Sequence, residues 1–229
     1  MSTLTNVYAT DEDIAIRAPA DFPILCPKDQ KLAAGADGSF SASLPWTLTS
    51  SSVDFSACGL TPGKILLLTK PVATFKPPGE ALVVVSTAPF AVTLRRKGLG
   101  SGAGQPPAPP SGLTGVEFAA VTLGPQIECS SYDLNRRYGI DDQVPGRRVV
   151  DLYDPREIRE ATILSVLYRQ YVAMSRETGD QGDTFGAKAV LVKSELDDLL
   201  DRVVVRWGSQ VALGAAEGST NRFGTRLVR

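Results

Sequence analysis

Two groups of basic residues give this chain its clearest capacity to bind a charged partner. The first group is consecutive in the sequence and consists of Arg95, Arg96 and Lys97. The second follows the last acidic residue of the chain and consists of Arg222, Arg226 and Arg229, together with the aromatic Phe223. A local basic cluster attracts DNA or an acidic protein surface. A solvated strand end is the plainer interpretation of the first group. For the second, a frayed terminus competes with a strand over 220–229 that pairs with an exposed sheet edge.

Catalytic and metal-binding signals are weak because the chain contains no histidine. Its absence removes the usual general base of serine and cysteine hydrolases and most transition-metal sites. Cys26, Cys58 and Cys129 lack the spacing of a zinc site or a disulfide framework, so we predict buried, small apolar side chains. No pair of carboxylates stands out either. We therefore predict neither an enzyme nor a cofactor or metal, although carboxylate or lysine chemistry stays open.

Three further polar patterns favour solvated surface over chemistry. The alternate glycines of 98–104 precede a proline-rich tract and not a helix, so we predict a loop or hairpin tip, with an assembly contact as the alternative. Asp180 and Asp183 lack the ligand spacing of a calcium loop. The acidic run is predicted to be the solvated face of a helix, or a surface that pairs with arginines of a neighbouring subunit. It comprises Glu195, Asp197, Asp198 and Asp201.

The strongest helical signals lie between residues 154 and 207. Asp154-Pro155-Arg156-Glu157 has the composition of a helix start, and 161–168 is apolar nearly all round, which requires cover on several sides. Tyr168 and Tyr171 are expected in the core, with a pocket wall as the alternative. After a short polar loop, a second helix carries an apolar stripe that consists of Phe185, Ala189, Val192, Leu196, Leu199 and Val203. We predict an antiparallel helical hairpin.

Other segments predict two further helices and a set of strands. Thr10 is a plausible N-cap for a short helix that Pro19 ends, and Pro125 opens a helix that Gly139 closes. The five predicted strands are short, rich in β-branched residues and separated by proline and glycine turns. They lie at 46–49, 64–69, 81–85, 91–94 and 116–121. Their close spacing favours a small antiparallel barrel or sandwich.

These elements together predict an α+β protein. Its fold would be a helical bundle, made of the hairpin and two further helices, with the β-barrel or sandwich inserted. The predicted parts are an N-terminal helix and connecting segment (1–43), the β-rich insertion (44–123), the helical bundle (124–207) and an extended C-terminal tail (208–229).

The net charge of −1 gives no global attraction to nucleic acid. No apolar run is long enough to span a bilayer, so we expect no membrane partner, and we expect no export signal.

The order of these pieces resembles the head-to-tail connector, or adaptor, proteins of tailed bacteriophages. The resemblance covers mainly 125–207, including the Asp154–Thr162 segment and the region from Tyr168 to Tyr171. In that family a helical bundle packs into a ring, commonly of twelve copies, beneath the portal, and an extended terminus engages a neighbouring ring. The β-rich insertion departs from the minimal all-helical members.

The resemblance implies a structural virion protein that is made in the host cytoplasm and placed in the neck between capsid and tail. It implies a homo-oligomeric ring that joins the portal protein to tail or neck proteins and lets DNA pass without sequence-specific binding. Arg222, Phe223, Arg226 and Arg229 would then dock onto the tail. Arg95, Arg96 and Lys97 would face the channel or a partner. The alternative is a nucleic-acid-binding small β-barrel protein, motivated by the same Arg95–Lys97 cluster.

Overall fold

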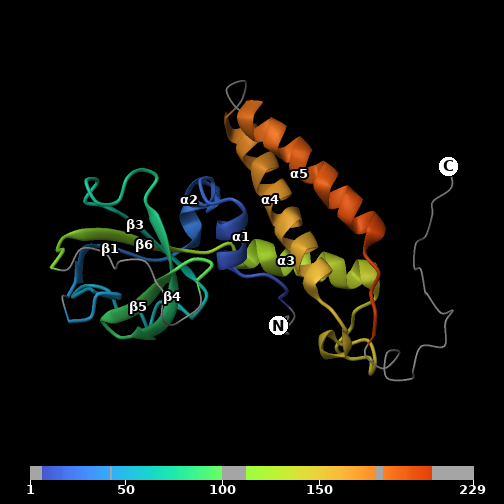
Figure 1. Ribbon diagram of the computed structural model, residues 1–229, viewed down its shortest axis with the longest axis horizontal. Helices are drawn as coiled ribbons and strands as arrows, with labels where there is room; N and C mark the ends of the chain where they lie inside the picture. The colour runs from blue at the N-terminus through green and yellow to red at the C-terminus, as the bar shows by residue number, and fades with distance from the viewer. Residues whose placement is uncertain (1–6, 42, 100–111, 179–182, 208–229) are drawn as a thin grey trace. The chain divides into compact units, whose positions relative to one another are not determined.

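The computed structural model describes residues 7–41, 43–99, 112–178 and 183–207 (Figure 1). The chain divides into two compact units, each described by itself below. One, the barrel unit, is Thr10–Pro125, and the other, the helical unit, combines Met1–Ala9 with Gln126–Arg229.

The described part of the barrel unit holds two short helices, a 3-10 turn and six strands. The helices are α1 (Asp11–Arg17) and α2 (Phe22–Leu25), and the turn η1 is Lys28–Gln30. The strands are β1 (Lys31–Phe40), β2 (Thr47–Thr49), β3 (Ile65–Lys70), β4 (Glu80–Ala88), β5 (Ala91–Arg96) and β6 (Val116–Val121). All five predicted strands are therefore present, with ends shifted by a few residues.

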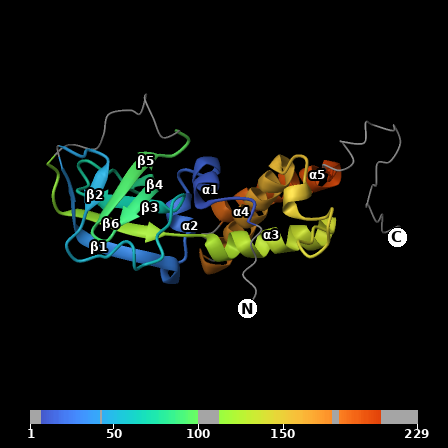
Figure 2. The same ribbon diagram turned by 90° about the horizontal axis from the view of Figure 1, so that it is seen from below.

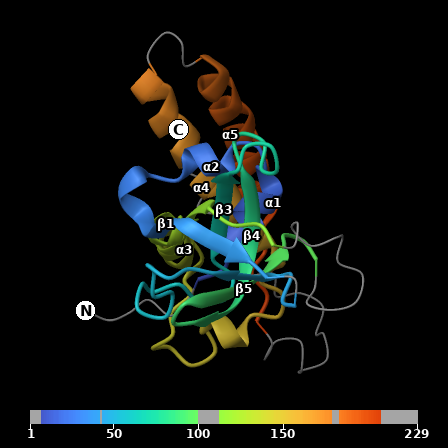
Figure 3. The ribbon, with the colours of Figure 1, turned by 90° about the vertical axis from the view of Figure 1, so that its left-hand side faces the viewer.

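The six strands form a closed antiparallel barrel in the order β1-β2-β5-β4-β3-β6. Strands β3, β4 and β5 are sequential neighbours, and β6 returns to lie beside β3, which is a Greek key. Figure 2 shows β1 beside β6, and Figure 3 shows β3 beside β4. Of the two predicted architectures, the structure has the barrel and not the sandwich.

Buried aromatic and aliphatic side chains fill the barrel. The Phe55 and Phe118 rings lie 5.5 Å apart at a tilt of 45°. The largest buried members of this core are Phe40, Leu48, Phe55, Leu66, Leu68, Phe75, Leu82 and Phe118. Because these side chains come from five strands and from the loops after β2 and β3, the barrel unit has a hydrophobic core of its own.

The sequence prediction missed β1, which closes the barrel between β2 and β6. Its sequence lacks β-branched residues, and Asp37-Gly38 is typical of a turn. The structure explains why glycine occupies positions 35 and 38 of this strand. A Cβ at Gly35 would lie 2.6 Å from Cζ of the buried Phe118 ring, and one at Gly38 would lie 2.8 Å from the Val116 carbonyl oxygen. The small residues let β1 approach β6 closely, which a β-propensity pattern does not reveal.

The described part of the helical unit is built on three helices. They are α3 (Gly124–Tyr138), whose first two residues belong to the barrel unit, α4 (Arg156–Thr178) and α5 (Asp183–Arg202). The sequence predicts Asp154 as N-cap and Pro155 as the first helical residue, which is one residue too early, since the first acceptor of α4 is the Pro155 carbonyl. Asp154 Oδ1 does accept a hydrogen bond from Arg156 N at 2.9 Å. Gly139 has a φ of 65° and ends α3 as predicted.

α4 and α5 form the predicted antiparallel hairpin, and α3 runs across its foot (Figure 1). Leu134 of α3 packs in one cluster with Ala161 of α4 and Leu199 of α5. The apolar 161–168 stretch is buried except for the half-buried Ser165 and Tyr168, which confirms that it requires cover on several sides. Below the hairpin, the turn η2 (Val149–Asp151) leads to a single antiparallel bridge between Leu152 and Trp207.

The predicted fold class is wrong in one essential respect, because the protein is not a helical bundle with an inserted barrel. Helix α1, assigned to the bundle from sequence, belongs to the barrel unit. The Asp11 carboxylate is fully buried and lies 3.2 Å from Lys64 Nζ. It also accepts hydrogen bonds from Thr122 Oγ1 at 2.8 Å and Leu123 N at 2.7 Å. These contacts attach α1 to the chain before β3 and after β6, so residues 10–40 supply two helices and a strand to the barrel unit.

Candidate interaction surfaces

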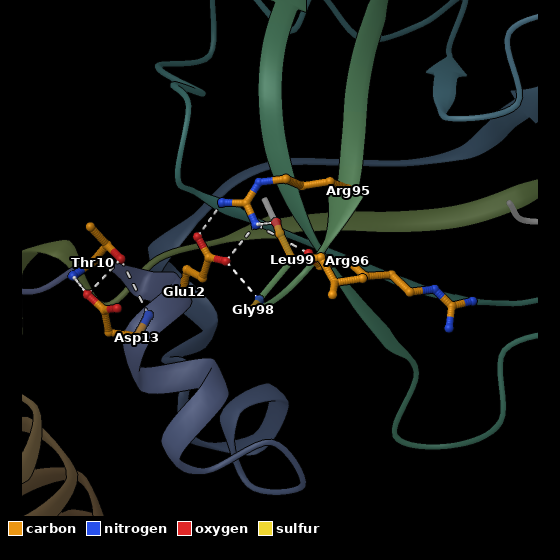
Figure 4. A network of polar contacts seen from close by, with 7 residues as sticks. All are labelled: Thr10, Glu12, Asp13, Arg95, Arg96, Gly98 and Leu99. Carbon is orange, nitrogen blue, oxygen red and sulfur yellow. Dashed lines mark hydrogen bonds and ion pairs between the residues drawn. The ribbon is translucent and has the colours of Figure 1, made fainter. Parts of the chain in front are cut away.

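The Arg95–Lys97 cluster lies at the end of β5, and its first residue is engaged by α1 (Figure 4). Arg95 Nη1 and Nη2 donate to the two carboxylate oxygens of Glu12 at 2.7 and 2.6 Å. Arg95 Nη1 also donates to the Leu99 carbonyl at 2.7 Å, and Gly98 N donates to Glu12 at 3.0 Å. The Arg95 and Glu12 side chains are only 19% and 14% exposed. Arg95 therefore ties the strand end to the first turn of α1.

The other two residues of the cluster point elsewhere or are half-buried. In Figure 4 the Arg96 side chain extends away from Glu12, and its Nη2 lies 3.4 Å from Glu80 Oε1. Burial lowers the pKa of Lys97, an effect that the nearby Glu80 carboxylate partly offsets. The three residues are close in space, but two of the three charges are paired within the chain. Their role in partner binding stays a prediction.

The capping of α1 positions Glu12 for this pairing. Thr10 Oγ1 accepts a hydrogen bond from Asp13 N, and the Asp13 carboxylate accepts one from Thr10 N at 2.9 Å. The sequence predicted Thr10 as N-cap, but it did not predict the reciprocal bond to Asp13 that completes this capping box. Both residues and their contacts appear in Figure 4.

A groove of about 400 Å³ runs between α4 and α5 on one side of the hairpin. Its small residues are Gly186 and Ala189, and a Cβ at Gly186 would lie 3.3 Å from Ser175 Oγ. The complete lining is Tyr168, Val172, Ser175, Arg176, Gly186, Ala189, Val190 and Lys193. Tyr168 therefore lines a pocket, the less favoured of the two interpretations from sequence. Tyr171 is 4% exposed and belongs to the interior as expected.

Helix α5 also carries large apolar side chains in solvent. Val190 and Leu191 are 70% and 68% exposed. Farther along the same helix, all four residues of the predicted acidic run are exposed, and Asp197 forms an ion pair with Lys193. The sequence prediction of a solvated acidic face therefore holds for the second half of α5. The exposed Val190 and Leu191 in the first half were not foreseen, because a periodic stripe identifies only the buried face.

A second cleft, of about 510 Å³, lies at the end of β2 beside the exposed Phe90. Its polar centre is Asp37, whose carboxylate accepts hydrogen bonds from three consecutive serines after β2, at Ser50, Ser51 and Ser52. The hydroxyl donors hold the pKa of Asp37 well below its usual range. Five donors occupy both carboxylate oxygens, so this carboxylate fixes the loop and has little capacity left for a ligand.

The cysteines behave only partly as predicted. Cys26 and Cys58 are half-buried, whereas Cys129 is exposed, so the prediction of burial is wrong for Cys129. Arg169 of α4 donates to its Sγ at 3.2 Å. Burial, with a smaller contribution from Asp11, raises the pKa of Cys26 to about 12. A thiol with so high a pKa is a poor nucleophile near neutral pH.

Several predicted sites lie outside the described residues. These are Arg222, Phe223, Arg226 and Arg229, most of the glycine loop, and Asp180 with the side chain of Asp183. Within 7–41, 43–99, 112–178 and 183–207, no three cysteine or acidic side chains come together as a metal site would require. Within the same ranges, no helix has the length and apolar character to cross a membrane.

Comparison of the chain with protein-family models, with curated proteins and with solved structures found no match in any of the three. The resemblance to phage connectors therefore stays a prediction from sequence.

Proposed function

We propose that the protein is a structural adaptor that forms a ring and joins the portal of a tailed bacteriophage to its tail, with DNA passing through. The observation that carries the proposal is the exposed apolar surface of the α4–α5 hairpin, where Val190 and Leu191 are 70% and 68% exposed. Large apolar side chains grouped on a helix beside an apolar groove are typical of protein–protein contact surfaces. A helical hairpin that contacts other subunits suits the wall of a ring.

The ion pairs at the end of β5 weigh against the rival function, a nucleic-acid-binding barrel. Affinity for nucleic acid depends on cations that can neutralise phosphates. Arg95 is already neutralised by Glu12, and Arg96 lies near Glu80. An adaptor that only lets DNA pass does not require a dedicated basic face. Binding of the purified protein to DNA that weakened steeply with salt would favour the rival.

Electron microscopy and analytical ultracentrifugation of the purified chain, alone and with the portal protein of the same phage, test the proposal. We expect rings, alone or on the portal. A chain that stays monomeric in both experiments would contradict the proposed function.

The predicted docking by Arg222, Phe223, Arg226 and Arg229 is tested separately. Deletion of 219–229 should abolish or strongly weaken co-assembly with the tail-side partner and with the portal, while leaving the described units folded. Unchanged co-assembly would show that docking does not require these residues.

A further inference from the structure

The groove between α4 and α5 and the exposed stripe on α5 lie on different faces of the same hairpin. α5 contributes Gly186, Ala189, Val190 and Lys193 to the groove. The stripe lies one helical face farther round and consists of Ala187, Val190, Leu191 and Ser194, of which Val190 is shared. With about 100° per residue, the centres of the two faces are roughly 100° apart. One hairpin therefore offers two apolar surfaces that face different directions. They are the groove and the exposed stripe, which acts as a ridge.

We propose that the exposed stripe of one copy packs into the groove of the next copy, with Leu191 as the central residue of the contact. This proposal rests on the proposed function, since it assigns the surface through which the ring would form. Leu191 is 68% exposed, and the groove of about 400 Å³ offers Val172, Ala189 and the Tyr168 ring as its apolar walls. The groove has room for the side chains of one helix because its α5 wall contains a glycine and an alanine.

Charges at the two surfaces agree with this arrangement. Asp198 continues the stripe, seven residues or about 10 Å beyond Leu191 along the helix axis, and is exposed. Arg176 is exposed at the loop end of the groove. If the incoming α5 lies antiparallel to the α5 that lines the groove, its Asp198 side chain comes near Arg176. The parallel orientation would instead place Asp198 near Lys193, which already pairs with Asp197.

A second copy is a better occupant than the chain's own C-terminal segment. The residues from 218 to 229 carry three arginines and no acidic side chain. The groove itself contributes Arg176 and Lys193, so like charges would meet there. The stripe of a second copy is itself uncharged and is continued by the acidic Asp198.

The geometry also determines the kind of assembly. Because ridge and groove are different surfaces, each copy uses one to bind the next and leaves the other for a third copy. Such a heterologous contact generates a closed ring when the rotation between copies closes. A self-complementary contact would stop at a dimer.

Sedimentation velocity of three single variants at micromolar concentration tests the contact. Leu191→Glu removes the ridge and Val172→Glu blocks the groove, and we expect each variant to be monomeric, with at least a tenfold loss in association. Val150→Glu, a matched control at a position 80% exposed in the same unit, should assemble as the wild type does. Circular dichroism checks that each variant retains its helices. Unchanged assembly of Leu191→Glu, or a wild-type chain that stays monomeric at its highest soluble concentration, would overturn the proposal.

Mixing the two variants distinguishes the heterologous contact from a symmetric one. Val172→Glu retains its ridge and Leu191→Glu retains its groove, so the mixture should form heterodimers and nothing larger. Rings in the mixture, or homodimers of either variant, would contradict the ridge-into-groove contact.

A charge exchange provides a second test because Val172 is half-buried and its variant has the greater risk of misfolding. Asp198→Arg and Arg176→Asp change exposed side chains. Each alone should weaken association several-fold, and the double variant should recover most of the loss. Failure of the double variant to recover would exclude the Asp198–Arg176 pairing and the antiparallel orientation with it.

The same samples separate this contact from the proposed function. If Leu191→Glu still forms rings that bind the portal protein, the contact is wrong and the adaptor function stands. If wild-type rings form through Leu191 but never bind the portal protein, the contact stands and the adaptor function is wrong.

Discussion

At the scale of single residues, the described structure uses its charges mainly to hold loops and helices in place. Glu12 and Arg95 are 83 positions apart, yet they form a two-point ion pair at 2.6 and 2.7 Å. Asp11, next to Glu12, is buried and bound by Thr122, Leu123 and Lys64. The basic cluster found in the sequence is thus partly a means of attaching α1 to the barrel.

The Glu12→Gln substitution should destabilise the barrel unit. The neutral amide would leave the half-buried Arg95 guanidinium without its counter-charge, so we expect a loss of about 1–3 kcal/mol. Glu117→Gln is the matched control, because Lys70 and Glu117 form an ion pair with exposures of 63% and 41%. An exposed pair contributes ~0–1 kcal/mol. Urea unfolding of both variants checks the difference, and equal losses would contradict the structural role of Glu12.

The Asp37 carboxylate should make stability depend on pH. Hydrogen bonds from Ser50, Ser51 and Ser52 lower its pKa in the folded protein, whereas an unfolded aspartate has a pKa of about 3.9. The unfolded state therefore binds the proton first, and the contribution of Asp37 is complete above pH ~4 and is lost as the pH falls below it.

Asp37→Asn measures this contribution. Its unfolding temperature should lie below that of the wild type at pH 7, and the gap should shrink as the pH is lowered through 4 towards the folded pKa. A gap that stays constant between pH 7 and the acid limit of folding would show that the charge of Asp37 is not responsible.

At the scale of elements, β1 is the strand that sequence patterns do not predict. Its strand conformation depends on β6, against which Gly35 and Gly38 leave room for Phe118 and the Val116 carbonyl. The β-propensity of residues 31–40 gives no information about the contact with β6.

Gly38→Ala should therefore be unfavourable although alanine is common in proteins. The added methyl would meet the Val116 carbonyl oxygen at 2.8 Å, and a backbone atom in a closed barrel cannot move aside easily. We expect a loss of about 1–3 kcal/mol, as for other overpacked sites. Ala36→Ser, at an exposed position of the same strand, is the control and should be nearly neutral. Unchanged stability of Gly38→Ala would show that the space between position 38 and the Val116 carbonyl can hold a methyl group.

Helices α1, α3, α4 and α5 were predicted because their signals are local, whereas the four-residue α2 was not predicted. Each of these signals is contained within its own helix or next to its end. The caps at Thr10 and Gly139 and the periodic apolar residues of α5 are examples that the structure confirms. Local signals could not predict that α1 belongs to the barrel unit, nor that a groove lies between α4 and α5. Both depend on side chains brought together across the fold, such as Glu12 with Arg95 and Ser175 with Gly186.

At the scale of the whole molecule, each unit has a separate cluster of buried apolar residues. The barrel cluster lies within Thr10–Pro125, and the cluster around Ala161 and Leu199 lies in the helical unit. A unit with its own core is expected to fold by itself.

A fragment of residues 10–125 tests this expectation. It should unfold cooperatively in urea, and Leu82→Ala should destabilise it by about 2–5 kcal/mol because Leu82 is fully buried. Leu199→Ala in the full chain should leave the transition of the barrel unit unchanged. A fragment without a cooperative transition would show that the barrel requires the helical unit.

The bridge between Leu152 and Trp207 has a mechanical consequence. Tyr153 N donates to the Arg206 carbonyl at 2.9 Å, so the chain leaving α5 is fastened to the segment that leads into α4. Tension applied to the chain beyond Trp207 would meet these hydrogen bonds before it reached the last turn of α5. The pull would then be shared by both helices of the hairpin, and α5 would be protected from being unwound from its end.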